Sequence, residues 1–269
     1  MNEQFFHIHH SLFDAIILRQ GAQLIHFQPK YGEPLLWSSA LSTFEKGKPF
    51  RGGIPICWPW FARRGVPSHG FARIMEWTLQ TFQESEKGVH LVFELNDSDA
   101  TREIWPHAFH ARLEMNLGQA VNIALHVKSH QETTGALHSY FTCKNIHDII
   151  ISGLGDSYQD ALQAEKLCVS ADEVLHVNGA IDRIYTKPEA QTRLIEPERT
   201  VLISHTNHSD VVIWNPWKEG SETLRDMQED DYQKMVCIES ARIFKPMKGE
   251  DSLQVKITLL DSRMSCIEG

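Results

Sequence analysis

The chain has 269 residues, of which 42% are hydrophobic and 23% are charged, as in ordinary water-soluble globular proteins. Its net charge of −9 argues against wholesale binding to nucleic acid or to an anionic membrane, so any bound anion must meet a local basic pocket. No run of about 18 apolar residues occurs, which excludes a membrane-spanning helix. We therefore expect neither nucleic acid nor a membrane as a partner.

The N-terminal segment and the cysteines bear on the location of the protein. The segment MNEQFFHIHHSLF lacks the cationic start and apolar core of a signal peptide, and its histidine cluster has no carboxylate at a metal-ligand spacing. The cysteines are odd in number, widely spaced and without a CxxC pair; they are Cys57, Cys143, Cys168, Cys237 and Cys266. We expect free thiols and a cytoplasmic protein.

Period-two alternation of apolar and polar residues dominates the chain. It is clear over residues 89–97 and 110–118, again over 120–130, and finally over 253–261. Many short strands at this spacing predict an all-β sandwich or barrel. Because the strand pattern continues from about residue 12 to 261 without a compositional break, we expect a single domain spanning 1–269.

Helical signals are few. The segments DSYQDALQAEKL (156–167) and SETLRDMQEDDYQKM (221–235) are each expected to form two or three helical turns, the second starting at Ser221.

The segment RGGIPICWPWFARRGVPSHGFAR (51–73) combines tandem glycines, prolines, tryptophans and arginines. Gly52 and Gly53 allow a close approach of the backbone to a ligand, and the prolines fix extended or turn geometry. Arg51 and Arg73 flank the segment with planar cationic forks that suit a phosphate or a carboxylate. Alternatively, the segment is a packed aromatic loop whose arginines pair with acids elsewhere, and the sequence alone leaves both readings open.

Two strands each carry one ionisable residue in an apolar setting. His138 shares a strand face with Ala136 and Tyr140, and Glu239 lies on the same face as Cys237. A histidine and a glutamate in a partly dry pocket form a natural general acid and general base. Each one alone is more often a structural residue, and spacing cannot show that the two meet.

Asp182 and Asn215 occupy predicted strand ends or turns, where polar ligand contacts and plain turn residues are both common. No P-loop, GxGxxG or nucleophile elbow occurs, so nucleotide cofactors and serine hydrolysis have no support.

Six motifs, RGGIPICWPWF, HGFAR, ALHSYF, DRIY, IWNPW and VCIESA, follow one another between about residues 50 and 242. Together they resemble the glucose-6-phosphate 1-epimerases, or hexose-6-phosphate mutarotases, which are relatives of the aldose 1-epimerases. The resemblance implies a galactose-mutarotase-like β-supersandwich with few short helices and a sugar cleft on its concave face. It also implies isomerase activity without a metal or an organic cofactor.

The same resemblance implies roles for individual residues. His138 of ALHSYF and Glu239 of VCIESA would be catalytic. The implied substrate-binding residues are Arg51 and Arg73 for a sugar phosphate, Asp182 for sugar hydroxyls, His69 as a further sugar-site histidine, and Ser68, which stands where some relatives carry glutamine.

The expected activity is interconversion of the α and β anomers of a hexose 6-phosphate, most of all D-glucose 6-phosphate, by a monomer or weak homodimer. The main alternative is a non-catalytic sugar or sugar-phosphate binding domain on the same fold, which would keep Arg51 and Arg73 but need no paired His138 and Glu239. A third alternative is a β-barrel metalloenzyme, which would require clustered histidine ligands that the sequence spacing does not offer beyond the N-terminus.

Overall fold

The computed structural model describes residues 4–170 and 172–261, and the prediction of an all-β fold is confirmed. The strands of the first half are β1 (Phe5–His9), β2 (Phe13–Leu18), β3 (Gln23–Pro29), β4 (Ile56–Cys57), β5 (Thr78–Ser85), β6 (Gly88–Asn96), β7 (Phe109–Leu117), β8 (Ala120–Leu137) and β9 (Tyr140–Thr142). Those of the second half are β10 (Ile150–Ser152), β11 (Ser157–Asp160), β12 (Lys166–Val169), β13 (Val174–Leu175), β14 (Ile181–Tyr185), β15 (Gln191–Ile195), β16 (Arg199–Thr206), β17 (Asp210–Asn215) and β18 (Met235–Asp261). The helical elements are α1 (Asp99–Ile104), α2 (Trp217–Thr223) and the short 3₁₀ turns η1 (Ala72–Ile74), η2 (Ile146–Asp148), η3 (Ala161–Gln163) and η4 (Asp231–Lys234).

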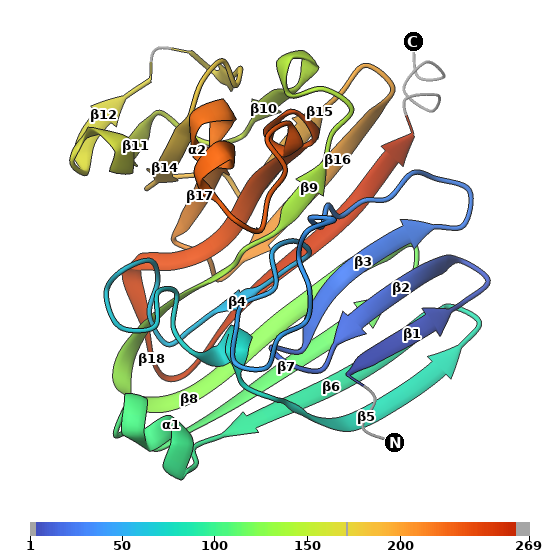
Figure 1. Cartoon of the computed structure of the whole chain (residues 1–269), viewed down its shortest axis with the longest axis vertical. Coiled ribbons are helices and arrows are strands. Elements are labelled where there is room, and N and C mark those ends of the chain that lie inside the picture. Colours follow the sequence, from blue (N-terminus) through green and yellow to red (C-terminus); the bar gives the residue numbers. More distant parts are fainter. Residues whose placement is uncertain (1–3, 171, 262–269) are drawn as a thin grey trace.

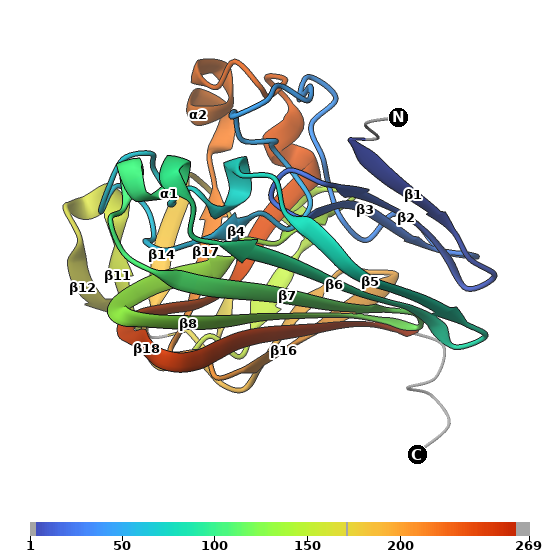
Figure 2. The same cartoon turned by 90° about the horizontal axis from the view of Figure 1, so that it is seen from below.

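The strands form a small and a large sheet. The small sheet has the order β1-β2-β3, and in the large sheet β12-β11-β14-β17-β18-β16-β15-β10-β13 form the main path. β18 is the central strand, because it also pairs with β8, which continues into β7, β6 and β5. The small sheet and both α-helices lie on one side of the large sheet, as Figures 1 and 2 show.

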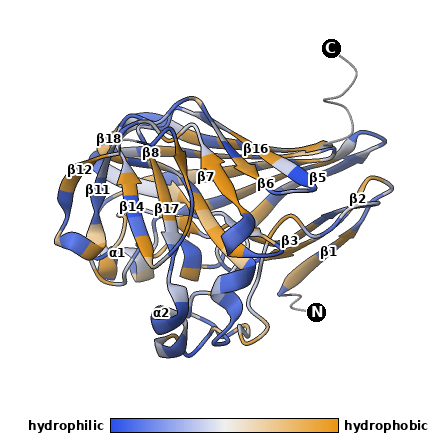
Figure 3. Ribbon diagram, turned by 90° about the horizontal axis from the view of Figure 1, so that it is seen from above, coloured by the Kyte–Doolittle hydropathy of each residue, from blue (hydrophilic) through white to orange (hydrophobic). Residues whose placement is uncertain are grey.

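The core lies between the two sheets and follows directly from the alternation in the sequence. Ile17 and Leu24 from the small sheet belong to one buried cluster with Leu91, Leu113 and Ile123 from the large sheet. Orange and blue stretches alternate along the strands in Figure 3, whereas α2 is largely blue and hydrophilic. The four strands predicted at 89–97, 110–118, 120–130 and 253–261 are all present.

The helix predicted over residues 156–167 is wrong, and the helix predicted over 221–235 is correct only at its start. Residues 156–167 form the hairpin of β11 and β12, because Tyr158 pairs with Tyr185 of β14 and left-handed backbone at Ala164 and Glu165 turns the chain. Sheet pairing here overrides a local preference for helix.

In the second segment, 221–235, the α-helix covers only the first three residues. α2 begins earlier, at Trp217, where the backbone N–H donates to the side chain of Asn215. It ends at Thr223, and only the 3₁₀ turn η4 follows, over Asp231–Lys234.

Candidate active site

His138 and Glu239 meet in the floor of the site. His138 lies between β8 and β9, where its backbone N–H donates to the carbonyl of Pro55, and Glu239 lies on β18 opposite Val212. Because Leu137 pairs with Ser240, the two functional residues become neighbours across adjacent strands. Nε2 of His138 and Oε1 of Glu239 are 3.3 Å apart, and both side chains are buried.

Burial acts on these two groups in opposite directions. It raises the pKa of Glu239 well above its ordinary value, an effect that the charge of Asp182 reinforces and that of Arg73 opposes. It lowers the pKa of His138 well below the usual range, and nearby His69, Arg73 and Arg51 lower it further. A dry site therefore makes the Glu239 carboxylate a stronger base and the His138 imidazolium a stronger acid than either is in water, and their contact lets the pair share one proton.

Two polar atoms of the pair have no hydrogen-bond partner within the described residues: Nδ1 of His138 and Oε2 of Glu239. Buried polar groups are nearly always satisfied, so atoms of this kind mark a place where a ligand or water completes the site.

A stack of aromatic rings fixes the imidazole. The ring of His138 lies 4.8 Å from that of Tyr140, with only 10° between their planes, and Tyr140 in turn stacks on Trp37 at 5.8 Å. The indole of Trp214 meets His138 edge-on at 6.4 Å. Because stacking removes rotational freedom, the imidazole keeps its orientation toward Glu239 without help from a ligand.

His69 is the second histidine of the site. Its ring lies 5.6 Å from that of His138 and 5.0 Å from that of Phe61. Burial, together with the charges of Arg73 and Arg51, lowers its pKa to about 3, so the ring is neutral at physiological pH. Nδ1 of His69 has no hydrogen-bond partner among the described residues, which leaves it available for a ligand.

The backbone conformation of the loop around His69 requires glycine at the next position. His69 has a φ of 62° and Gly70 a φ of 71°. A Cβ on Gly70 would lie 2.1 Å from the carbonyl oxygen of Trp58. The loop that carries His69 therefore packs directly on the backbone of Trp58, with no room for a side chain at position 70.

Arg51 and Arg73 bring positive charge to the two histidines. Arg51 is joined to Asp226, with Nε and Oδ1 2.8 Å apart, and its Nη1 donates to the hydroxyl of Tyr140 at 3.3 Å. Arg73 donates from Nη2 to the carbonyl of Ser68 at 2.8 Å, while its Nε has no partner within the described chain. Both charges lower the pKa of His138, so both arginines lie near enough to act on its imidazole.

Ser68 and Asp182 are placed less directly. The Ser68 hydroxyl is exposed and donates to the carbonyl of Ala62, so its visible contribution is the carbonyl that orients Arg73. Asp182 lies on β14 opposite Trp214 and is half-buried. Burial and the charge of Asp160 raise the pKa of Asp182.

The sequence reasoning missed Tyr140, Trp214 and Asp226. Tyr140 shares its predicted strand face with His138, and Trp214 belongs to the IWNPW motif, so both carried a signal. Asp226 lies within an acidic segment that resembles an ordinary solvated helix, and only the fold brings it to Arg51.

The described residues offer no metal site, no membrane-spanning helix and no disulfide bond. Within residues 4–170 and 172–261, no cluster of three histidine, cysteine or acidic side chains is placed to hold a metal ion, and no helix is long and apolar enough to cross a membrane. Four of the five cysteines are described, all as free thiols, and Cys266 lies outside the described residues.

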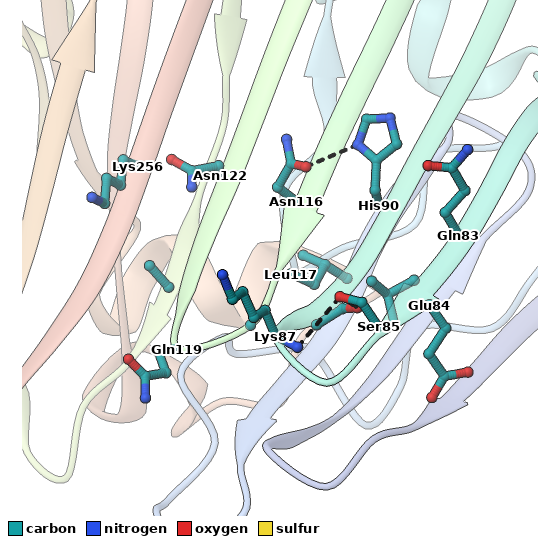
Figure 4. Close-up of a pocket in the computed structure, with 14 residues that line it drawn as sticks. Gln83, Glu84, Ser85, Lys87, His90, Asn116, Leu117, Gln119, Asn122 and Lys256 are labelled. Carbon is teal, nitrogen blue, oxygen red and sulfur yellow. Dashed lines mark hydrogen bonds between the residues drawn. The ribbon is translucent and has the colours of Figure 1, made fainter.

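A separate hollow of about 670 Å³ opens at the far ends of β5–β8 (Figure 4). It is lined by cross-strand neighbours such as His90, Asn116 and Asn122 together with Lys87 and Lys256. None of the candidate site residues lines it, and it holds no acid–base pair comparable to that of His138 and Glu239.

A large β fold with a buried acid–base pair beside two arginines and a neutral histidine is suited to proton transfer on a small anionic molecule. Comparison with known proteins identifies the class. The chain matches the family model for aldose 1-epimerase over residues 4–252.

A Salmonella typhimurium protein named "Putative glucose-6-phosphate 1-epimerase" is 38% identical over 249 residues, which cover 91% of this chain and 85% of that protein. The crystal structure of a "putative mutarotase" from Salmonella typhimurium has a TM-score of 0.93 at 36% identity, covering 96% of this chain and 90% of the other. A galactose mutarotase related enzyme from Lactobacillus acidophilus shares the fold, with a TM-score of 0.73 at 15% identity over 96% of this chain and 98% of its own.

The chain therefore belongs to the aldose 1-epimerase family and is an isomerase of the mutarotase type. The predicted galactose-mutarotase-like fold is confirmed by these structures.

Proposed function

We propose that the chain interconverts the α and β anomers of a hexose 6-phosphate, D-glucose 6-phosphate above all. The observation that carries this proposal is the 3.3 Å contact between the side chains of His138 and Glu239, a buried acid and a buried base. Two arginines, Arg51 and Arg73, lie beside this pair. The name of the Salmonella relative supports the same substrate.

The chemistry requires one acid and one base that exchange roles. Glu239 takes the proton from the C1 hydroxyl while His138 donates a proton to the ring oxygen, and the C1–O5 bond breaks to give the open aldehyde. After rotation about C1–C2, the steps run backwards on the other face. The pair holds one proton before and after each half-reaction, and ring opening moves that proton from the imidazole to the carboxyl.

The opposite pKa directions support this cycle. Burial makes the carboxylate a stronger base and the imidazolium a stronger acid than either is in water, so both transfers are driven in the required sense. The substrate hydroxyls would then fill the unpartnered positions at Oε2 of Glu239 and Nδ1 of His69.

Substrate binding is assigned to the residues around the pair. Arg51 and Arg73 would hold the phosphate, and neutral His69 and Asp182 would contact sugar hydroxyls. Ser68 would act through its carbonyl, which already accepts from Arg73. Anchoring a phosphate away from C1 lets binding energy orient the reacting end of the sugar.

We propose a single domain, a cytoplasmic location and a monomeric or weakly dimeric state. Free thiols at Cys57, Cys143, Cys168 and Cys237 support the reducing location.

Exchange between the anomers of glucose 6-phosphate, measured by magnetisation-transfer NMR, tests the proposal directly. Wild-type protein should accelerate the exchange, and His138→Asn should abolish the acceleration while the sugar phosphate still binds. Saturable binding without any acceleration by the wild type would instead favour the non-catalytic sugar-phosphate binding domain.

A further inference from the structure

Arg51 reaches the site already paired. Its guanidinium is held by three groups: the Asp226 carboxylate at 2.8 Å from Nε, the Tyr140 hydroxyl at 3.3 Å from Nη1, and the Trp214 ring, whose centroid lies 6.0 Å from Cζ. The Arg51 side chain is only 19% exposed, whereas that of Asp226 is 35% exposed. The Nε hydrogen does not line up with the carboxylate, so this contact is an ion pair rather than an aligned hydrogen bond.

The segment that carries Asp226 is fixed by contacts of its neighbours. It runs between α2 and η4, and the side chain of Met227 is buried in a cluster with Trp37 and Tyr140. The backbone N–H of Gln228 donates to Oδ2 of Asp231 at 2.8 Å. The Asp226 carboxylate is therefore not needed to shape its own loop, and its ion pair with Arg51 serves another purpose.

We propose that Asp226 is a positioning residue that holds Arg51 ready for the phosphate and thereby sets the preference for sugar phosphates over free sugars. This inference rests on the proposed function, because it assigns the phosphate to Arg51. Among the described residues, the ion pair of Asp226 is with Arg51, and that of Glu239 is with His138, so Asp226 acts through Arg51 and not through the acid–base pair.

The donor geometry of arginine explains how one side chain serves two anions. A guanidinium has five N–H donors, and in the free protein Asp226 faces Nε while Tyr140 takes one hydrogen of Nη1. Within the described residues, the remaining donors at the terminal nitrogens of Arg51 have no partner and are open to phosphate oxygens. An arginine side chain has many rotamers, so holding it beforehand lowers the entropy that binding must remove.

The same arrangement also connects the phosphate position to the catalytic pair. Tyr140 accepts from Arg51 at its hydroxyl and stacks on His138 with its ring, so the arginine and the acid share one rigid support. A free hexose has no phosphate for Arg51 to bind. Loss of Asp226 should therefore change the kinetic constants for a free hexose little.

Asp226→Asn tests the inference, because it removes the charge while keeping the size of the side chain. The matched control is Asp230→Asn, which removes the same charge from the same segment at an exposed ion pair with Lys234, 2.7 Å long. KM and kcat are measured for glucose 6-phosphate and for free glucose, together with the inhibition constant of inorganic phosphate and calorimetric binding of glucose 6-phosphate.

We expect Asp226→Asn to raise both KM for glucose 6-phosphate and the phosphate inhibition constant up to about tenfold, the size that ordering one long side chain on binding typically costs. The kcat should change much less, free glucose should be affected less than twofold, and Asp230→Asn should match the wild type. A loss shared equally by both sugars would make Asp226 merely structural and overturn the inference. Tighter binding of phosphate by Asp226→Asn would overturn it too, since the carboxylate would then oppose the ligand.

Failure of the inference and failure of the proposed function can be told apart. If Arg51→Ala weakens glucose 6-phosphate selectively but Asp226→Asn does not, the function stands and the role of Asp226 is lost. If the wild type neither binds glucose 6-phosphate in the calorimeter nor accelerates its anomer exchange, both are lost.

Discussion

The chemistry that we propose for His138 and Glu239 depends on the burial of both side chains. A glutamate in water is a weak base and a histidine in water a weak acid, and burial strengthens each in the role that ring opening requires. The contact between them means that one proton serves both. The charge of Arg73 opposes the pKa shift of Glu239 and adds to the pKa shift of His138, so the arginine that we propose to bind the phosphate also acts on the acid–base pair.

Glu239→Gln should remove the base while leaving the shape of the site. Because an amide cannot take the C1 proton, we expect the rate of anomer exchange to fall by about 10²–10⁴-fold, the usual contribution of a positioned acid or base. Binding of glucose 6-phosphate, measured by calorimetry, should stay within a few-fold of wild type. A variant that keeps most of the wild-type rate would take Glu239 out of the base role.

Arg73→Ala should separate sugar phosphates from free sugars. Charge-assisted hydrogen bonds to an anion contribute about 1.5–3 kcal/mol, so kcat/KM for glucose 6-phosphate should fall about 10- to 100-fold. Free glucose should lose much less, and the control Arg64→Ala, which removes an exposed cation from the same loop, should affect neither sugar. Equal losses for both sugars would argue that Arg73 does not hold the phosphate.

At the scale of elements, the segment 51–73 shows what its many glycines and prolines do for the candidate site. Gly53 has a φ of 61°, and a Cβ there would lie 2.1 Å from the carbonyl oxygen of Leu24, so the loop docks on β3 without any gap. Gly70 docks in the same way on the backbone of Trp58. These close approaches bring Arg51 and Arg73 to the same pair of histidines.

Gly70→Ala should disturb this loop more than backbone strain alone. The matched control is Gly47→Ala, because Gly47 also has a positive φ, 78°, but nothing lies within 4 Å of its Cβ position. We expect Gly47→Ala to lower the free energy of unfolding by about 1 kcal/mol through strain alone, and Gly70→Ala by more than about 2 kcal/mol through strain and collision. Denaturant unfolding and anomer exchange check both, and equal effects from the two variants would show that the docking at Trp58 has no energetic weight.

The sequence predicted some elements well because their pattern is local. The strand at 120–130 alternates strictly, and β8 buries Val121, Ile123 and Leu125 as expected. The helix prediction for residues 156–167 was wrong because Tyr158 pairs with Tyr185, which lies far along the chain. No local sequence pattern indicates this pairing.

The candidate site shows the same division between local and long-range information. His138 and Glu239 were each visible as ionisable residues in apolar strands, but their contact depends on the register of β8 and β18. Asp226 could not be predicted, since its role arises only from its ion pair with Arg51.

At the scale of the whole molecule, the second half of the large sheet contains a buried histidine network apart from the candidate site. His205 on β16 lies between two hydroxyls, with Nδ1 2.6 Å from Oγ of Ser240 and Nε2 3.0 Å from Oγ1 of Thr192. Ser240 follows Glu239 directly on β18, so this network fixes the strand that carries the proposed base. Burial, reinforced by the charge of His208, lowers the pKa of His205 to about 3.

His205 should therefore make the whole fold less stable as the pH falls below 6.5. Below the ordinary histidine pKa of 6.5, His205 is protonated in the unfolded chain, whereas in the folded protein it stays neutral down to about pH 3. Because the unfolded chain binds the extra proton, the free energy of unfolding falls as the pH falls. For a group this buried the loss amounts to about 3 kcal/mol between pH 6.5 and pH 4. His205→Gln, which keeps a neutral polar side chain, should reduce this pH dependence by about that amount in denaturant unfolding, with the remainder due to buried His69 and His138, whereas His176→Gln at an exposed site should leave it unchanged. An identical slope in His205→Gln and wild type would mean that His205 is protonated in the folded protein.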